Sequence, residues 1–220
     1  MAKQTLLLGR EAARVQAAMD RLQRDRVIAR IWEGDASVWS ADPDVQADIR
    51  SRLGWLRIAD VMAPQLEALA AFGREVQRGG RTHALVLGMG GSGLFPEVCR
   101  EILQPAGGLD LLVLDTTDPA AIRAGQSRAP LSQLLVVVSS KSGTTSEIHA
   151  LSKYFYGAFE SAGIPPGQGC VGITDEGTPL AAEAERLKFL KTFLHGPKTG
   201  ADVGGRFSAL TYFGLVPGAL

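Results

Sequence analysis

From residue 83 onward, short apolar runs alternate with helical patterns of about a dozen residues, and this alternation sets the fold class. The apolar runs that predict strands cover residues 83–88, 109–114, 134–139, 170–174 and 189–194. Continuous apolar runs are typical of strands buried on both faces, as in a parallel sheet between two layers of helices. The helices between the strands are expected to begin near Ser92, Pro119, Thr145 and Thr178. The sequence therefore predicts an α/β fold with a doubly wound, five-stranded parallel sheet.

The first 80 residues have a different pattern, with many charges and apolar residues at helical spacing. Helices are expected over residues 11–30, after the capping pair Asp42-Pro43, and over residues 55–76. We expect residues 1–80 to form a helical extension that packs on a main domain of residues 81–220. Trp32, Trp39 and Trp55 are the candidates for that packing.

Charge and cysteine content exclude several classes of protein. Lys and Arg together number 23, as do Asp and Glu, so there is no basic excess to bind nucleic acid or an anionic membrane. Cys99 and Cys170 lack the spacing of a disulfide framework or a zinc site, and we expect both to be buried.

No apolar run approaches the roughly 20 residues of a membrane span, and the first apolar run is too short for a signal peptide. A cytoplasmic location is expected by default.

Hydroxyl side chains directly follow the third apolar run. Residues 139–147 read Ser-Ser-Lys-Ser-Gly-Thr-Thr-Ser-Glu, at the point where a strand should end and a helix begin. Ligands of open α/β sheets bind at the carboxyl ends of the strands, and the N-terminus of the following helix attracts anions. The motif therefore predicts a site for a phosphorylated small molecule. Its alternative interpretation is a cluster of helix-capping residues.

A glycine-rich segment, Gly-Met-Gly-Gly-Ser-Gly at residues 88–93, follows the first strand and allows a ligand to approach the backbone. Its position resembles a dinucleotide-binding loop, with Asp115 as a candidate ribose ligand. However, most hydroxyl side chains follow the third strand, which argues against a nicotinamide cofactor. The sequence also contains no Walker phosphate-binding motif.

Near the end of the chain, residues 202–208 read Asp-Val-Gly-Gly-Arg-Phe-Ser. The Arg206 guanidinium, just behind a glycine pair, is suited to stabilise negative charge on a reacting oxygen. Pairing with Asp202 is the alternative. The three histidines, His83, His149 and His195, have no evident catalytic partner, and we expect each to be structural.

Taken together, four motifs resemble the sugar isomerase domain of the phosphoglucose isomerase family. They are Gly-Met-Gly-Gly-Ser at 88–92, Asp-Thr-Thr-Asp-Pro at 115–119, and the segments 139–147 and 202–208. The resemblance covers about residues 30–220 and implies a flavodoxin-like domain, the first of two in the family. The segment before the sheet looks most like the isomerase part of bifunctional transaldolase and phosphoglucose isomerase proteins.

The family resemblance implies interconversion of glucose 6-phosphate and fructose 6-phosphate through a cis-enediolate, a step of glycolysis and gluconeogenesis. It implies no metal or organic cofactor, a sugar phosphate as the small-molecule partner, and a homodimer. The expected phosphate ligands are Ser92, Ser140, Lys141, Ser142 and Thr145. Close backbone approach to the sugar is expected at Gly90, Gly91 and Gly205. By the same resemblance, Arg206 stabilises the enediolate and Glu147 orients a neighbouring catalytic group.

The sequence also departs from the family pattern. Gly93 stands where relatives often carry a polar residue, and no Glu-Ser-Asn-Gly-Lys-like motif, which holds the family's general base, occurs in the chain. The expectation is therefore an N-terminal, phosphosugar-binding portion of an isomerase that is inactive alone. A stand-alone sugar-phosphate-binding regulatory module is the alternative.

Overall fold

A computed structural model describes residues 7–103, 107–196, 199–200 and 202–220. The chain divides into two compact units, Met1–Leu53 and Gly54–Leu220, and each is described by itself. The helices that precede the sheet, between residues 58 and 78, belong to the second unit. The expected packing of an N-terminal extension on the main domain stays a prediction.

The first unit is helical. Its elements are a 3₁₀ turn at Gly9–Glu11, α1 (Ala12–Arg24), α2 (Val27–Trp32), a 3₁₀ turn at Ala36–Val38, and α3 (Pro43–Arg50). The prediction of one helix over residues 11–30 is wrong, because Arg26 adopts a left-handed conformation with φ of 51°, which ends a right-handed helix. The predicted cap of α3 is confirmed. Asp42 accepts a hydrogen bond from the Asp44 N–H (2.9 Å), and Pro43 occupies the first helical position.

The second unit alternates strands and helices. Its helices are α4 (Ile58–Met62), α5 (Leu66–Arg78), α6 (Gly91–Leu103), α7 (Pro119–Gln126), α8 (Ser146–Ser161), α9 (Pro166–Gly169), α10 (Pro179–Leu187) and α11 (Tyr212–Ala219). Short 3₁₀ segments lie at Gly54–Leu56, Ala63–Gln65, Leu131–Gln133 and Gly205–Leu210 (η6). The helix expected over residues 55–76 is interrupted around Pro64, since proline lacks the N–H that continues an α-helix.

The sheet confirms the predicted fold class. Within the described residues it has five parallel strands in the order β2-β1-β3-β4-β5, the flavodoxin-like order. The strands are β1 (His83–Gly88), β2 (Asp110–Leu114), β3 (Leu134–Ser139), β4 (Cys170–Asp175) and β5 (Lys191–His195). β1 and β3 have the predicted bounds, whereas β5 lies later in the chain than residues 189–194.

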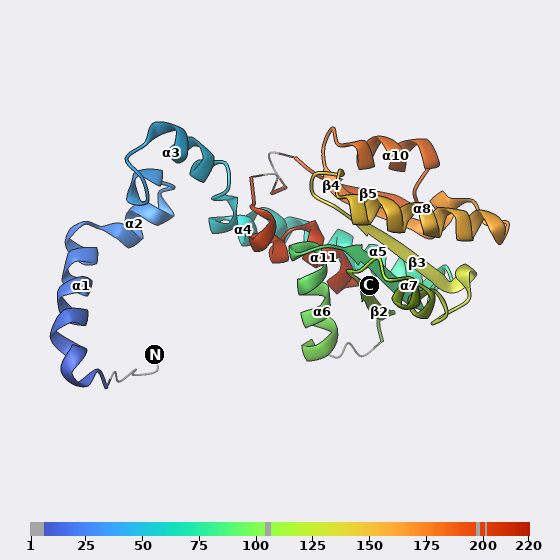
Figure 1. Cartoon of the computed structure of the whole chain (residues 1–220), viewed down its shortest axis with the longest axis horizontal. Coiled ribbons are helices and arrows are strands. Elements are labelled where there is room, and N and C mark those ends of the chain that lie inside the picture. Colours follow the sequence, from blue (N-terminus) through green and yellow to red (C-terminus); the bar gives the residue numbers. More distant parts are fainter. Residues whose placement is uncertain (1–6, 104–106, 197–198, 201) are drawn as a thin grey trace. The chain divides into compact units, whose positions relative to one another are not determined.

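Both faces of the sheet are covered by helices, as the apolar runs predict. Along β1, Ala84 and Val86 join a core with residues of α5 and α11, while Leu85 and Leu87 join a second core with residues of α8. Figure 1 shows α8 and α10 on one side of the sheet and α6 and α11 on the other. Successive side chains of a strand point to opposite faces of the sheet, so alternate residues of a buried strand belong to one core and the residues between them belong to the other.

The chain connections that leave β1 and β3, which are neighbouring strands, run to opposite faces of the sheet. β1 leads into α6, which contacts α11, and β3 leads towards α8 on the opposite face. The last residues of the two strands, Gly88 and Ser139, are partners in the parallel register. In open α/β sheets, the crevice at such a switch point is where ligands bind.

Two further sequence predictions concern cysteines and membranes. Cys99 and Cys170 are buried free thiols, and burial raises the pKa of Cys170 to about 12. Of the helices in the described part of the chain, none is long and apolar enough to cross a membrane.

Candidate functional site

A cavity of about 370 Å³ lies at the carboxyl edge of the sheet, at the switch point between β1 and β3. Segments after β1 and β3, the end of β4 and the start of η6 contribute to its wall. The lining residues are Met89, Gly91, Ser92, Ser139, Ser140, Lys141, Ser142, Thr145, Asp175 and Gly205. The structure therefore brings together three of the four motifs that the sequence analysis singled out.

The segment Ser139–Thr145, hereafter the phosphate loop, contributes most of the hydroxyl groups. The Ser140 and Thr145 hydroxyls lie 3.1 Å apart, and the Ser142 hydroxyl accepts hydrogen bonds from the Thr144 N–H (3.2 Å) and hydroxyl (2.9 Å). The buried Ser139 hydroxyl has no hydrogen-bond partner among the described residues. A buried hydroxyl without a partner is costly, so a ligand oxygen in the cavity would stabilise it.

The helix α8 begins directly after the phosphate loop. Its N-cap residue, Thr145, makes no side-chain capping bond in the described structure, because its hydroxyl faces Ser140 instead. The first N–H groups of the helix therefore lack the usual side-chain acceptor. Together with the helix dipole, these groups make the start of α8 favourable for an anion.

The glycines of the first loop have different surroundings. Residues 89–92, which follow β1 and include the start of α6, are hereafter called the β1 loop. A Cβ on Gly91 would lie 2.0 Å from the carbonyl oxygen of Gly205, so the β1 loop and η6 meet backbone to backbone. Gly90 has a φ of 59° and lines a neighbouring hollow of about 240 Å³ with Glu97 and Asp115. The structure thus places Gly91 and Gly205 in the cavity wall and Gly90 beside it.

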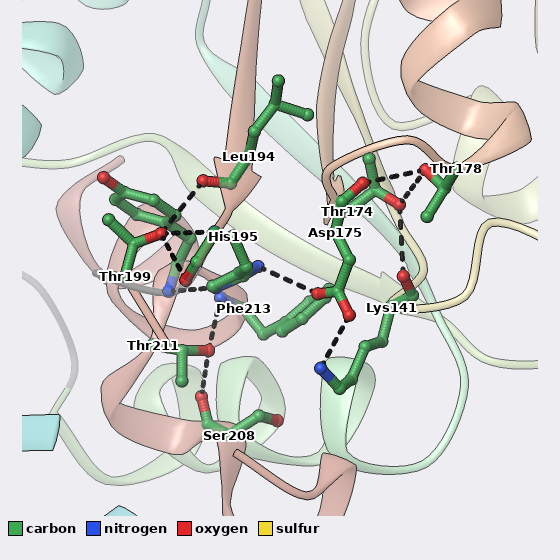
Figure 2. A network of polar contacts seen from close by, with 12 residues as sticks. Lys141, Thr174, Asp175, Thr178, Leu194, His195, Thr199, Ser208, Thr211 and Phe213 are labelled. Carbon is green, nitrogen blue, oxygen red and sulfur yellow. Dashed lines mark hydrogen bonds and ion pairs between the residues drawn. The ribbon is translucent and has the colours of Figure 1, made fainter. Parts of the chain in front are cut away.

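Lys141 is fixed to the end of β4 through both its backbone and its side chain. Its carbonyl accepts hydrogen bonds from the Asp175 N–H (3.2 Å) and the Thr174 hydroxyl (3.3 Å), and its ammonium lies 2.7 Å from Asp175 Oδ2. Figure 2 shows this network continuing from Asp175 to His195, the last residue of β5. The ion pair makes this part of the cavity nearly neutral, so the groups there that are able to bind an anion are hydroxyl and N–H donors.

His195 is buried, with 1% of its surface exposed, and its ring stacks on Phe213 at a centroid distance of 4.7 Å. Its Nε2 accepts a hydrogen bond from the Tyr212 N–H (3.1 Å), so the neutral ring carries its proton on Nδ1. This Nδ1 lies 3.7 Å from Asp175 Oδ1, and neither atom has a hydrogen-bond partner among the described residues. Burial, together with the nearby Lys141 ammonium, lowers the pKa of His195 to about 4.

The lowered pKa of His195 predicts a loss of stability in mild acid. Between pH 6.5 and 4 the unfolded chain binds a proton at this residue that the folded chain does not, so stability falls as the pH falls. Between pH 7 and pH 5 the free energy of unfolding should drop by roughly 2 kcal/mol from this group. Urea unfolding at both pH values checks this, with His195→Phe as the comparison. An equal pH effect in the two proteins would contradict it.

The two residues predicted to be catalytic are exposed. Arg206 lies in η6 next to Gly205, and Glu147 lies in the first turn of α8. Among the described residues, those that line the cavity include neither of them. No ion pair between described residues joins Arg206 to Asp202, so the structure does not show the alternative role that the sequence left open.

Three residues that line the cavity were not among the predicted ligands: Met89, Ser139 and Asp175. His195, which lies behind Asp175, was not predicted either. Ser139 belongs to the predicted motif, and Asp175 follows an apolar run, so position at the end of a strand was the available signal. His195 was expected to be structural, and its proximity to Asp175 follows from the pairing of β4 with β5. No group of three His, Cys, Asp or Glu side chains in the described part is placed to hold a metal ion.

Comparison with known proteins gives relatives in sequence, although no model of a known family matches the chain. A glucose-6-phosphate isomerase of Synechococcus sp. (strain CC9605) is 32% identical over 217 residues, which cover 89% of this chain and 39% of the relative. Another, from Synechococcus sp. (strain JA-3-3Ab), is 38% identical over 146 residues, covering 64% of this chain and 27% of the relative. The chain therefore spans less than half the length of these relatives.

Solved structures share the fold. A hypothetical protein from Thermus thermophilus superposes with a TM-score of 0.75 at 25% identity, over 98% of this chain and 48% of that one. A glucose-6-phosphate isomerase from Chlamydia trachomatis D/UW-3/Cx has a TM-score of 0.63 at 26% identity, over 84% of this chain and 33% of that one. The partial coverage fits the expectation of an N-terminal portion. Sequence and fold together place this chain in the phosphoglucose isomerase family, over part of its members' length.

Proposed function

We propose that the chain forms the phosphosugar-binding part of a glucose-6-phosphate isomerase. The observation that carries this proposal is the convergence of five hydroxyl side chains on one cavity at the switch point of the sheet. They belong to Ser92, Ser139, Ser140, Ser142 and Thr145. Hydroxyl donors beside a helix N-terminus suit a phosphate group, which offers several acceptor oxygens and carries negative charge. The family relationship supports a hexose phosphate as the ligand.

In this proposal the phosphate anchors the substrate in the cavity and the sugar extends towards η6. A cis-enediolate forms when a proton leaves the carbon beside the carbonyl of the open-chain sugar, and negative charge then develops on its oxygens. It is consumed when a proton returns to the neighbouring carbon. Arg206 is the candidate that stabilises this charge, because it follows a cavity-lining glycine and a guanidinium donates several hydrogen bonds to oxygen anions. Glu147 is proposed to orient a neighbouring catalytic group.

Substitution of Arg206 distinguishes the active site of an isomerase from the binding site of a regulatory module. We expect Arg206→Ala to weaken binding of an enediolate analogue by about 2 kcal/mol, while fructose 6-phosphate binds nearly as before, since the charge develops only during the reaction. Calorimetric titration of both ligands measures this difference. Equal, small effects on the two ligands would instead favour a regulatory module.

We also propose that the 220-residue chain binds hexose phosphates without turning them over efficiently. Asp175 is the one carboxylate among the described residues that line the cavity, and it is already held in an ion pair with the Lys141 ammonium at 2.7 Å. A positioned general base typically contributes about 10²–10⁴-fold to the rate. The homodimer, the cytoplasmic location and independence from cofactors stay predictions.

Thermal shift measurements test the proposed ligand class directly. Fructose 6-phosphate should raise the melting temperature of the chain, because a ligand that binds only the folded state stabilises it, and NAD should not. A coupled isomerase assay on the same protein should show turnover far below that of a complete enzyme. Stabilisation by NAD and not by fructose 6-phosphate would contradict the proposed ligand class. Rapid turnover in the isomerase assay would contradict the claim of low activity.

A further inference from the structure

Asp175 places a negative charge in the wall of a cavity that is proposed to bind an anion. Its carboxylate is one-quarter exposed, and Oδ2 pairs with the Lys141 ammonium at 2.7 Å. Its other oxygen, Oδ1, is buried and faces His195 Nδ1 at 3.7 Å. The carboxylate is therefore directed away from the cavity on one side and neutralised by an ammonium on the other (Figure 2).

The surroundings of His195 fix the direction of its N–H. The ring stacks on Phe213, and the Tyr212 N–H at the start of α11 donates to Nε2. These contacts leave Nδ1 as the protonated nitrogen, and Nδ1 lies 3.7 Å from Asp175 Oδ1. The separation is longer than a hydrogen bond, but a partial positive charge beside a buried carboxylate oxygen still stabilises that orientation.

We propose that His195 is a positioning residue, which holds the Asp175 carboxylate on Lys141 and away from the bound phosphate. This inference rests on the proposed phosphate site. Asp175 Oδ1 makes no hydrogen bond in the described part of the chain, so removing His195 takes away the polarised N–H that lies 3.7 Å from this buried oxygen. An unpaired buried carboxylate oxygen is costly, so the side chain would turn towards the water of the cavity. There its charge would repel a phosphate dianion.

Calorimetric titration with fructose 6-phosphate and inorganic phosphate tests this role. His195→Phe keeps a stacking ring but removes both nitrogens, and it should weaken binding of both ligands about tenfold. In an Asp175→Asn background the same substitution should have no effect on affinity, because no carboxylate charge remains to turn. The control His83→Phe removes an imidazole at the opposite end of the sheet and should leave affinity unchanged.

Two conservative variants distinguish positioning from simple structural support. His195→Asn keeps an amide N–H near the Nδ1 position and should bind as the wild type does, whereas His195→Gln keeps a group near Nε2 and should bind weakly. Their comparison remains informative if His195→Phe fails to fold. The inference would be overturned if the His195→Asn and His195→Gln variants bound the ligands with equal affinity. It would also be overturned if His195→Phe weakened binding as much in the Asp175→Asn background as in the wild type. Neither result would contradict the proposed function. Failure of the wild-type chain to bind either ligand would overturn the proposed function, and this inference with it.

Discussion

Replacing Ser142 by aspartate is expected to lower the affinity for fructose 6-phosphate by about a hundredfold without unfolding the chain. Ser142 is exposed, lines the cavity, and accepts a hydrogen bond from the Thr144 N–H at 3.2 Å. An aspartate carboxylate can accept the same bond, so the local turn should persist. A carboxylate about 5 Å from a phosphate dianion repels it by roughly 3 kcal/mol at an effective dielectric constant of about 40.

The matched control is Ser132→Asp, which adds the same charge just before the amino end of the same strand, β3. This variant should bind fructose 6-phosphate as the wild type does, because the charge lies far from the carboxyl edge. Calorimetric titration measures both affinities, and circular dichroism confirms that both variants are folded. Equal affinities of the Ser142 and Ser132 variants would show that the phosphate binds elsewhere.

Substitution of Gly91 by alanine is expected to have the largest effect on stability. The added Cβ would lie 2.0 Å from the Gly205 carbonyl oxygen and 3.2 Å from the Ser208 hydroxyl, so backbone segments must move apart. Overpacking against backbone costs roughly 3 kcal/mol, and here it also displaces the segment that carries Arg206. We therefore expect a lower melting temperature together with weaker sugar phosphate binding.

Gly157→Ala serves as the control for Gly91→Ala. Gly157 lies within α8, and apart from the backbone of its own helix a Cβ there would meet no atom within 4 Å. Alanine is the better helix former, so this variant should gain about 0.5–1 kcal/mol in stability. Chemical unfolding compares the two substitutions. If Gly91→Ala were as stable as the wild type, the close contact between the β1 loop and η6 would be contradicted.

Central strands were predictable from sequence, whereas edges and breaks were not. The apolar runs of β1 and β3 end at Gly88 and Ser139. Strands that are buried on both faces produce such continuous apolar runs. β5 lies at the edge of the sheet, where Lys191 and Leu194 are exposed, so its pattern has no sharp start. The break after α1 depends on the left-handed conformation of Arg26, a residue type that gives no signal for it.

The phosphate loop was predictable for a related reason. Its hydroxyl residues are contiguous in the chain, so their shared position at the end of β3 follows from the sequence pattern alone. The contact between Lys141, Asp175 and His195 depends instead on the order of three neighbouring strands. Residues from separate strands meet only once the pairing of the sheet is known, which explains why His195 was predicted to be merely structural.

The central claim is that a sugar phosphate binds in the cavity between the β1 loop and the phosphate loop. The most direct test is amide chemical shift mapping of the 220-residue chain during titration with fructose 6-phosphate. The claim predicts the largest shifts for the N–H groups of residues 139–147 and of Gly91 and Ser92, with saturation at one equivalent of ligand. Saturable shifts confined to other parts of the chain, or no saturable shifts, would contradict it.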